Sequence, residues 1–202
     1  MKTLLTGFGP FGNVTDNPSQ LIVENLAERA REGQWPDLVA DVLPTEFAGA
    51  GNRIAQLIRE HRPERVICLG VAKGTGSIRL ERVALNLDDT SVPDNAGVYL
   101  EGKKIVPDGP LAYWSTLPIE DMCGELQGRG IPANISNHAG TYVCNHVFYV
   151  ARHEIELLGS SAPCGFIHLP DVARPSGRRE RESVGLSLNV MQAAVELCLR
   201  AR

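Results

Sequence analysis

Five cysteines and five histidines are the side chains of this 202-residue chain best suited to nucleophilic chemistry. Cys144 stands apart, because a polar, glycine-containing turn at 136–141 leads through it into a segment with helical spacing of apolar residues. Backbone N–H groups at a helix N-terminus stabilise a thiolate and can hold the oxyanion of a tetrahedral intermediate. The position favours a nucleophile, with a structural cysteine as the alternative. The other cysteines lie in apolar strands or on helix faces and are predicted to be buried thiols: Cys68, Cys123, Cys164 and Cys198.

A cysteine nucleophile needs a general base, and the base needs a group that fixes its tautomer. His168 lies in a short apolar run at 165–169, where a rigid strand can present the imidazole to a loop crevice, so it is the preferred base; a hydrogen-bonded core histidine is the alternative. His138, in the turn before the cysteine, is a competing base. His146 follows the cysteine by two residues, and such neighbours point apart on a helix. Glu81 is expected to orient the imidazole, because an unpaired carboxylate on an apolar strand face would be costly.

A glycine-rich turn follows the first predicted strand. Residues 7–12 match G-x-G-x-x-G, the spacing of a dinucleotide-binding turn. However, Pro10 removes a backbone amide, two phenyl rings crowd the turn, and the next helix begins late, near Pro18. The dinucleotide hypothesis is therefore disfavoured against two alternatives. One is a purely structural turn, and the other is an apolar wall, formed by Phe8 and Phe11, for a flat, uncharged ligand.

Short apolar runs alternate with segments of helical periodicity along the chain. Strands are predicted at 2–6, 38–43, 65–69, 80–87, 133–136 and 165–169, and helices at about 17–33, around 54–58, at about 117–128 and 142–158, and from Ser183 onward. This order predicts one α/β domain over residues 1–202, a three-layer sandwich with a twisted, mostly parallel sheet and helices on both faces. The irregular segment 88–117 is long enough to be an active-site or assembly loop, with a hairpin near 101–103.

Composition excludes several classes of protein. The chain has 20 Lys and Arg against 24 Asp and Glu, a net charge of −4, and no long basic block, so nucleic acid is not an expected partner. No run approaches the roughly 18 apolar residues of a membrane span, and no signal peptide is visible. The usual metal-ligand spacings are absent, so no metal or cofactor is expected. The odd, widely spaced cysteines indicate thiols of a reducing, cytoplasmic compartment.

Four motifs occur in order along the chain. They are residues 6–12 with 17–19 (TGFGPFG and NPS), 81–86 (ERVALN), 136–145 (SNHAGTYVCN) and 165–170 (GFIHLP). Together they resemble the pyroglutamyl peptidase I family, the pyrrolidone-carboxylate cysteine peptidases. The resemblance covers nearly the whole chain, and its order of glutamate, cysteine and histidine agrees with the residues chosen above.

The resemblance implies hydrolysis of the N-terminal pyroglutamyl residue from peptides through a thioester acyl-enzyme. In this scheme Cys144 is the nucleophile, His168 transfers protons and Glu81 orients the imidazole. A pyroglutamyl ring carries no ammonium group, so its pocket should offer apolar walls and hydrogen bonds to the lactam. By resemblance the substrate-binding residues are Phe8, Phe11, Asn17, Thr45, Val71 and Tyr142. The resemblance also implies a homo-dimer or homo-tetramer.

Three positions depart from the family pattern. Thr75 and Ser91 stand where arginine is common, and His138 replaces a small hydroxyl residue. If an arginine at position 91 helps to hold the oxyanion, its loss lowers the rate by roughly tens to hundreds of fold. Arg79 could substitute for it, while His138 could crowd the nucleophile or alter its protonation. A weakly active or non-catalytic relative that binds pyroglutamyl peptides is therefore the alternative function.

Overall fold

The computed structural model describes residues 1–12, 16–173 and 185–201, which form a seven-stranded sheet and five helices. The strands are β1 (Thr3–Phe8), β2 (Leu38–Leu43), β3 (Arg65–Val71), β4 (Ile78–Leu85), β5 (Ala112–Trp114), β6 (Ala133–His138) and β7 (Cys164–Leu169). The helices are α1 (Pro18–Arg31), α2 (Phe47–His61), α3 (Ile119–Gly128), α4 (Val143–Leu157) and α5 (Leu188–Arg200). Each predicted strand is present, and β5 lies inside the segment that the sequence predicts to be irregular.

The strand order is β2-β1-β3-β7-β4-β5, and β6 pairs with β4. The strands β1, β2, β3 and β7 are mutually parallel. The strand β4 runs antiparallel to β7, while β6 is parallel to β4 and β5 is antiparallel to it. The sheet is mixed but mostly parallel, which confirms the predicted fold class. Because β7 and β4 run in opposite directions, the carboxyl end of β7 meets the beginning of β4.

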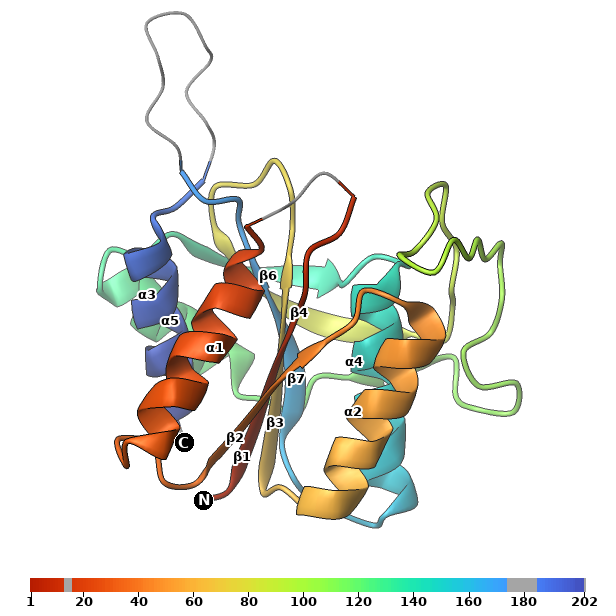
Figure 1. Cartoon of the computed structure of the whole chain (residues 1–202), viewed down its shortest axis with the longest axis horizontal. Coiled ribbons are helices and arrows are strands. Elements are labelled where there is room, and N and C mark those ends of the chain that lie inside the picture. The colour runs from red at the N-terminus through yellow and green to blue at the C-terminus, as the bar shows by residue number, and fades with distance from the viewer. Residues whose placement is uncertain (13–15, 174–184, 202) are drawn as a thin grey trace, which may run out of the picture.

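Helices cover both faces of the sheet (Figure 1). The helices α2 and α4 lie on one face, and α1, α3 and α5 lie on the other. Each layer has its own apolar core, so strands such as β1, β3 and β7 are buried on both faces. The largest buried side chains include Phe148, Tyr149 and Phe166 on the α2 and α4 side, and Ile22, Leu26 and Ile67 on the other.

The first helix begins where the sequence predicts it, at residues 17–18. The last one begins at Leu188, where the hydroxyl of Ser187 accepts a hydrogen bond from Val190 N–H at 3.3 Å. The predicted start at Ser183 is therefore wrong, and that residue lies outside the described residues. Ser183 and Ser187 are both of a residue type that caps helices, so the sequence alone does not distinguish between them.

The loop between β4 and β5 has little regular structure and is organised by buried amides. Asn86 Nδ2 donates to the Val106 carbonyl at 2.8 Å, and its Oδ1 accepts from Val106 N–H at 2.9 Å. The predicted hairpin is reduced to one antiparallel bridge between Asp88 and Lys103. In Figure 1 the loop (yellow-green) stands beside α2 and α4. A long loop held in this way can position other residues.

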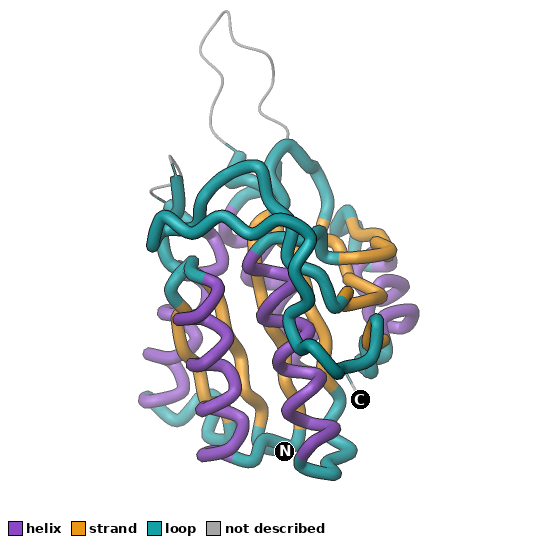
Figure 2. Tube along the Cα trace, turned by 90° about the vertical axis from the view of Figure 1, so that its right-hand side faces the viewer, coloured by secondary structure: helices purple, strands orange, loops and turns teal. Residues whose placement is uncertain are grey.

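Figure 2 looks onto the face covered by α2 and α4 and shows the longer loops gathered at the end of the sheet opposite the N-terminus. The carboxyl ends of β1, β3 and β7 lie at this end. Binding sites of α/β sheets form at such an edge, outside the ends of parallel strands. Among the described residues, no helix combines the length and apolar character needed to cross a membrane.

Candidate active site

A cavity of about 340 Å³ lies at the carboxyl ends of β1, β3 and β7. All nine site residues expected from the sequence line it: Glu81, Cys144 and His168, together with Phe8, Phe11, Asn17, Thr45, Val71 and Tyr142. The remaining lining residues are Ala72, Arg79, His138, Ala139, Gly140 and Val143. The fold thus brings residues from both halves of the sequence to one hollow.

Cys144 is the second residue of α4 and is half-buried, whereas the other four cysteines are buried free thiols. The backbone of Tyr142 before it is extended, at φ −95° and ψ −168°, and its side chain does not cap the helix. The first-turn N–H groups therefore have no side-chain acceptor among the described residues. Gly140, at φ +81°, provides the turn that leads from β6 into α4. This geometry leaves backbone donors at the helix N-terminus available for an oxyanion.

His168 and Glu81 are joined by a hydrogen bond between neighbouring strands. Nδ1 of His168 and Oε1 of Glu81 lie 2.7 Å apart, and both residues are buried. Burial by itself lowers the pKa of His168, but the charge of Cys144 and hydrogen bonding with Cys144 and Glu81 outweigh it and raise the pKa to about 9. The imidazole is therefore held in its charged form at neutral pH, between the thiol and the carboxylate.

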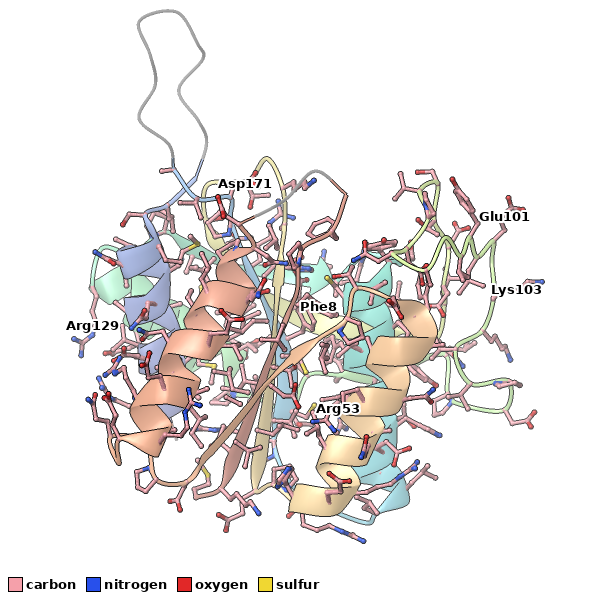
Figure 3. The ribbon with its side chains drawn as sticks, viewed as in Figure 1. Phe8, Arg53, Glu101, Lys103, Arg129 and Asp171 are labelled. Atoms are coloured by element: carbon pink, nitrogen blue, oxygen red, sulfur yellow. The ribbon has the colours of Figure 1, made fainter. Side chains whose placement is uncertain are left out.

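The aromatic part of the cavity lining comes from the glycine-rich turn. Phe8 is almost completely buried, and Figure 3 shows it in the interior between the helical layers. Asn17 Nδ2 and Thr45 Oγ1 both donate to the Gly9 carbonyl, at 2.9 and 3.3 Å. These two hydrogen bonds fix the turn that carries Phe8 and Phe11. Asn17 and Thr45, which line the cavity themselves, therefore hold the aromatic surface in place.

Backbone amides of this turn are already used within the protein. Phe8 N–H donates to Ser19 Oγ at 3.0 Å, Gly9 N–H donates to the Leu43 carbonyl at 3.0 Å, and Pro10 has no N–H. Residues 8–10 therefore offer no row of free amides to a pyrophosphate. The structure opposes the dinucleotide hypothesis, while Phe8 and Phe11, the side chains of the expected apolar wall, both line the cavity.

The loop between β4 and β5 braces three parts of the cavity lining. The Tyr142 hydroxyl donates to the Pro93 carbonyl at 2.9 Å. Asn95 N–H donates to the Thr45 carbonyl at 3.0 Å, and Asn95 Nδ2 donates to the Pro10 carbonyl at 2.8 Å. These contacts connect the loop to the site, which is one of the two roles that the sequence left open.

Gly70 is a site position that sequence reasoning missed. A Cβ at Gly70 would lie 2.9 Å from Cys144 Sγ and 2.8 Å from Phe166 Cζ, closer than real Cβ atoms approach their neighbours. The strand β3 can pass beneath the nucleophile only because glycine stands there. A glycine inside a buried apolar strand is the signal that could have found it, since such residues mark close approach.

The positions that depart from the family pattern lie in different surroundings. Ser91 is exposed and is not part of the cavity lining, and Thr75 Oγ1 bonds within its own loop. His138 lines the cavity, and its Nδ1 accepts from Gly140 N–H at 3.1 Å. Within the described residues His138 has no carboxylate partner, so it lacks the orienting group that His168 has. Arg79, the suggested substitute for a missing arginine, does line the cavity.

A second histidine–carboxylate pair lies outside the cavity. His146 Nδ1 and Asp88 Oδ2 are 2.7 Å apart, and the ring packs against Gly51 and the edge of Phe47. His146 does not line the cavity, in agreement with its spacing from Cys144 on the helix. Within residues 1–12, 16–173 and 185–201, no group of three His, Cys, Asp or Glu side chains is arranged to hold a metal ion.

Comparison with known proteins places this architecture in a family. A family model described as pyroglutamyl peptidase matches residues 1–201. The chain belongs to the pyroglutamyl peptidase family. The pyrrolidone-carboxylate peptidase of Oceanobacillus iheyensis is 41% identical over 205 residues, covering 98% of this chain and 97% of that protein. That of Bacillus cytotoxicus is 38% identical over 200 residues, covering 98% of this chain and 92% of that protein.

Solved structures of pyroglutamyl peptidases share the fold. A mutant pyrrolidone carboxyl peptidase from Pyrococcus furiosus matches with a TM-score of 0.89 at 34% identity, covering 98% of this chain and 96% of that one. Pyroglutamyl peptidase I from Bacillus amyloliquefaciens matches with a TM-score of 0.87 at 37% identity, covering 97% and 93%. The resemblance found in four sequence motifs is confirmed over the whole chain, which is a cysteine peptidase of the pyroglutamyl class.

Proposed function

We propose that this pyroglutamyl peptidase acts with Cys144 as its nucleophile, His168 as the carrier of protons and Glu81 as the residue that positions the imidazole. The observation that carries the proposal is the convergence of the three in one cavity. Glu81 is bonded to His168 at 2.7 Å, and Cys144 stands in the first turn of α4. The reaction is acyl transfer to a thiolate, followed by hydrolysis of the thioester.

In the first half-reaction the Cys144 thiolate attacks the pyroglutamyl carbonyl carbon. A C–S bond forms, and the carbonyl π electrons move onto oxygen, where first-turn N–H groups of α4 stabilise the charge. The His168 imidazolium then gives its proton to the leaving nitrogen as the C–N bond breaks. The products are a thioester on Cys144, a neutral imidazole and a peptide shortened by one residue.

Acylation prepares His168 for the second half-reaction. The thioester carries no charge, so the electrostatic interaction with Cys144 that raises the pKa of His168 is lost. The neutral imidazole can then accept a proton from water, which attacks the thioester carbonyl and releases pyroglutamate. Nδ1 of His168 stays hydrogen-bonded to Glu81 throughout, so Nε2 is the atom that takes part in these proton transfers. Thiolate and imidazolium are regenerated at the end of the cycle.

The pyroglutamyl ring fits the aromatic part of the cavity. The ring is flat and uncharged, so Phe8, Phe11 and Tyr142 offer suitable apolar surface, with the carboxyl end of β3 at Val71 available for hydrogen bonds to the lactam. Asn17 and Thr45 support the turn, as their hydrogen bonds to Gly9 indicate. The lining residues that the structure describes include no unpaired carboxylate of the kind that would select a free ammonium group, since Glu81 is bonded to His168.

The test is hydrolysis of a fluorogenic pyroglutamyl amide by three proteins: the unaltered chain, Cys144→Ala and Cys198→Ala. Cys144→Ala should lower kcat/KM by at least about a thousandfold. Cys198→Ala removes a buried thiol of α5 and should leave kcat/KM nearly unchanged. Iodoacetamide should inactivate the unaltered chain and Cys198→Ala alike. Turnover by Cys144→Ala at the unaltered rate would overturn the mechanism, and failure of the unaltered chain to turn over any pyroglutamyl amide would overturn the activity.

We further propose a cytoplasmic location and a homo-dimer or homo-tetramer. The five free thiols support a reducing compartment, and the oligomer is proposed from the family resemblance. Light scattering after size-exclusion chromatography would measure the molar mass directly, and a monomer at working concentrations would contradict the oligomer. Detection of the chain in a periplasmic or secreted fraction would contradict the location.

A further inference from the structure

We propose that Arg79 determines substrate specificity by binding a carboxylate on the leaving-group side of the scissile bond. The enzyme would then prefer peptides that carry a negative charge directly after the pyroglutamyl residue. This inference rests on the proposed function, because it concerns the substrate of the same cavity.

Arg79 stands beside the residues proposed to carry out catalysis. It lines the cavity and is half-buried. In the antiparallel register of β4 and β7, Arg79 is directly paired with His168, and it precedes Glu81 on β4 by two residues. Alternate residues of a strand point to the same face, so Arg79 and Glu81 both face the cavity.

The guanidinium of Arg79 has no hydrogen bond or ion pair with any described residue. In the same part of the chain, every other arginine that is buried or half-buried bonds to a carboxylate, an amide oxygen or a backbone carbonyl: Arg29, Arg53, Arg65, Arg82 and Arg152. Among the described residues, the one carboxylate that lines the cavity is Glu81, and it is bonded to His168. A partly desolvated cation without a partner is unfavourable, and an anionic ligand relieves that cost.

The reaction determines which part of the substrate meets Arg79. The ring lies against the uncharged surface of Phe8 and Phe11, and His168 gives its proton to the leaving nitrogen. The residue after pyroglutamate therefore lies on the His168 side of the cavity, where β4 is the neighbouring strand. A carboxylate within one residue of the scissile bond is in reach of a long arginine side chain, which can bind it through two parallel N–H donors.

Two sources supply such a carboxylate: the free C-terminus of a pyroglutamyl dipeptide, or an aspartate or glutamate side chain in a longer peptide. Both are tested on the unaltered protein. One pair of substrates is pyroglutamyl-alanine and its amide; the other is pyroglutamyl-glutamyl-alanine amide and its glutaminyl counterpart. We expect about a five- to tenfold higher kcat/KM for the charged member of at least one pair. The pair that shows the preference identifies the source, and equal values in both pairs would overturn the proposal.

The variant Arg79→Gln should remove this preference, and Arg79→Lys should keep part of it. Arg129→Gln is the matched control, because it also removes one positive charge, but from an exposed ion pair with Glu125 at the far end of α3 (Figure 3). An equal fall in kcat/KM for charged and neutral substrates in Arg79→Gln would overturn the proposal, since an oxyanion or structural role acts on all substrates alike.

Binding separates this inference from the catalytic proposal. In the Cys144→Ala background, calorimetry with the same substrate pairs should show tighter binding of the charged peptide, and Arg79→Gln should abolish the difference. Absence of turnover in the unaltered chain would defeat the proposed function while leaving this binding test intact. Turnover without any charge preference in rate or binding would defeat only the role of Arg79.

Discussion

The sulfur of Cys144 lies against the backbone of Gly70, where an added Cβ would be only 2.9 Å from Sγ. The position of the proposed nucleophile is thus set from two sides. The first turn of α4 carries it, and the strand β3 passes directly beneath it without a side chain. A small displacement of a reacting group can cost about a hundredfold in rate, so this contact should matter for catalysis.

We therefore expect Gly70→Ala to lower kcat/KM by about ten- to a hundredfold. The added methyl group would clash with both Cys144 Sγ and the ring of Phe166, which would lie 2.8 Å away, so the site must shift to accommodate it. Gly124→Ala is the control. Gly124 lies in α3, and a Cβ at this position would have no neighbouring atom within 4 Å. Steady-state kinetics and the rate of alkylation by iodoacetamide measure the effect. Unaltered values for both in a folded Gly70→Ala protein would show that the contact has no functional importance.

His168 should titrate at about pH 9 rather than near its ordinary value of 6.5. Cys144 and Glu81 both raise this pKa against the effect of burial, so Cys144→Ala and Glu81→Gln should each lower it. Nuclear magnetic resonance of the labelled imidazole measures the pKa directly. A value near 6.5 in the unaltered chain, or no change in either variant, would contradict the proposed arrangement.

The same raised pKa gives stability a pH dependence of definite sign. Between pH 6.5 and about 9 the native state keeps a His168 proton that the unfolded chain has released, so the free energy of unfolding falls as the pH rises through this range. The contribution is fully present below pH 6.5 and is worth about 3 kcal/mol. Urea denaturation should show that the stability advantage of the unaltered chain over His168→Gln narrows across this range. An advantage that widens would contradict the sign.

Local patterns explain why much of the site could be predicted from the sequence. Cys144 is recognisable because a polar turn meets a helical segment, and His168 because it lies in a short apolar run. The partner of His168 is not local. Glu81 is 87 residues away, and the two meet through an antiparallel register of β4 and β7 that no sequence pattern specifies. The role of Glu81 was therefore predicted from the cost of an unpaired carboxylate and from the family resemblance, and not from the topology of the sheet.

Other features were beyond sequence reasoning for physical reasons. The strand β5 is only three residues long, too short for a periodic pattern. Gly70 matters through a contact with a residue far along the chain, and a single glycine does not reveal its neighbours. The hydrogen bonds that tie Asn95 to Thr45 and Pro10 depend on the path of an irregular loop. Tertiary contacts of this kind have no local signature.

Asp94 should be important for both stability and substrate binding. It is buried; its Oδ2 accepts from Phe47 N–H at 2.9 Å, at the start of α2, and its Oδ1 accepts from Ala96 and Val98 N–H groups at 2.9 and 2.8 Å. The helix has no side-chain cap from its own N-cap residue. Asp94→Ala should lower the free energy of unfolding by about 3 kcal/mol, because three donors lose their acceptor.

The effect of Asp94→Ala on kinetics should appear mainly in KM, since the loop that carries Asp94 also holds the segment of Thr45. Asp108→Ala, a change at an exposed position of the same loop, is the control. Urea denaturation and steady-state kinetics on a pyroglutamyl amide provide the measurements. Equal stability of the two variants would show that the buried carboxylate does not organise this part of the site.

The two histidine–carboxylate pairs should differ in their roles, one in catalysis and the other in stability. The pairs of His168 with Glu81 and of His146 with Asp88 have the same 2.7 Å separation, but only the first lines the cavity. His168→Gln should lower kcat/KM by at least about a hundredfold, because proton transfer is lost. His146→Gln should keep kcat/KM within about threefold while lowering the free energy of unfolding by about 1 kcal/mol. A large loss of activity in a fully folded His146→Gln protein, with His168→Gln still active, would reverse the assignment of the catalytic histidine.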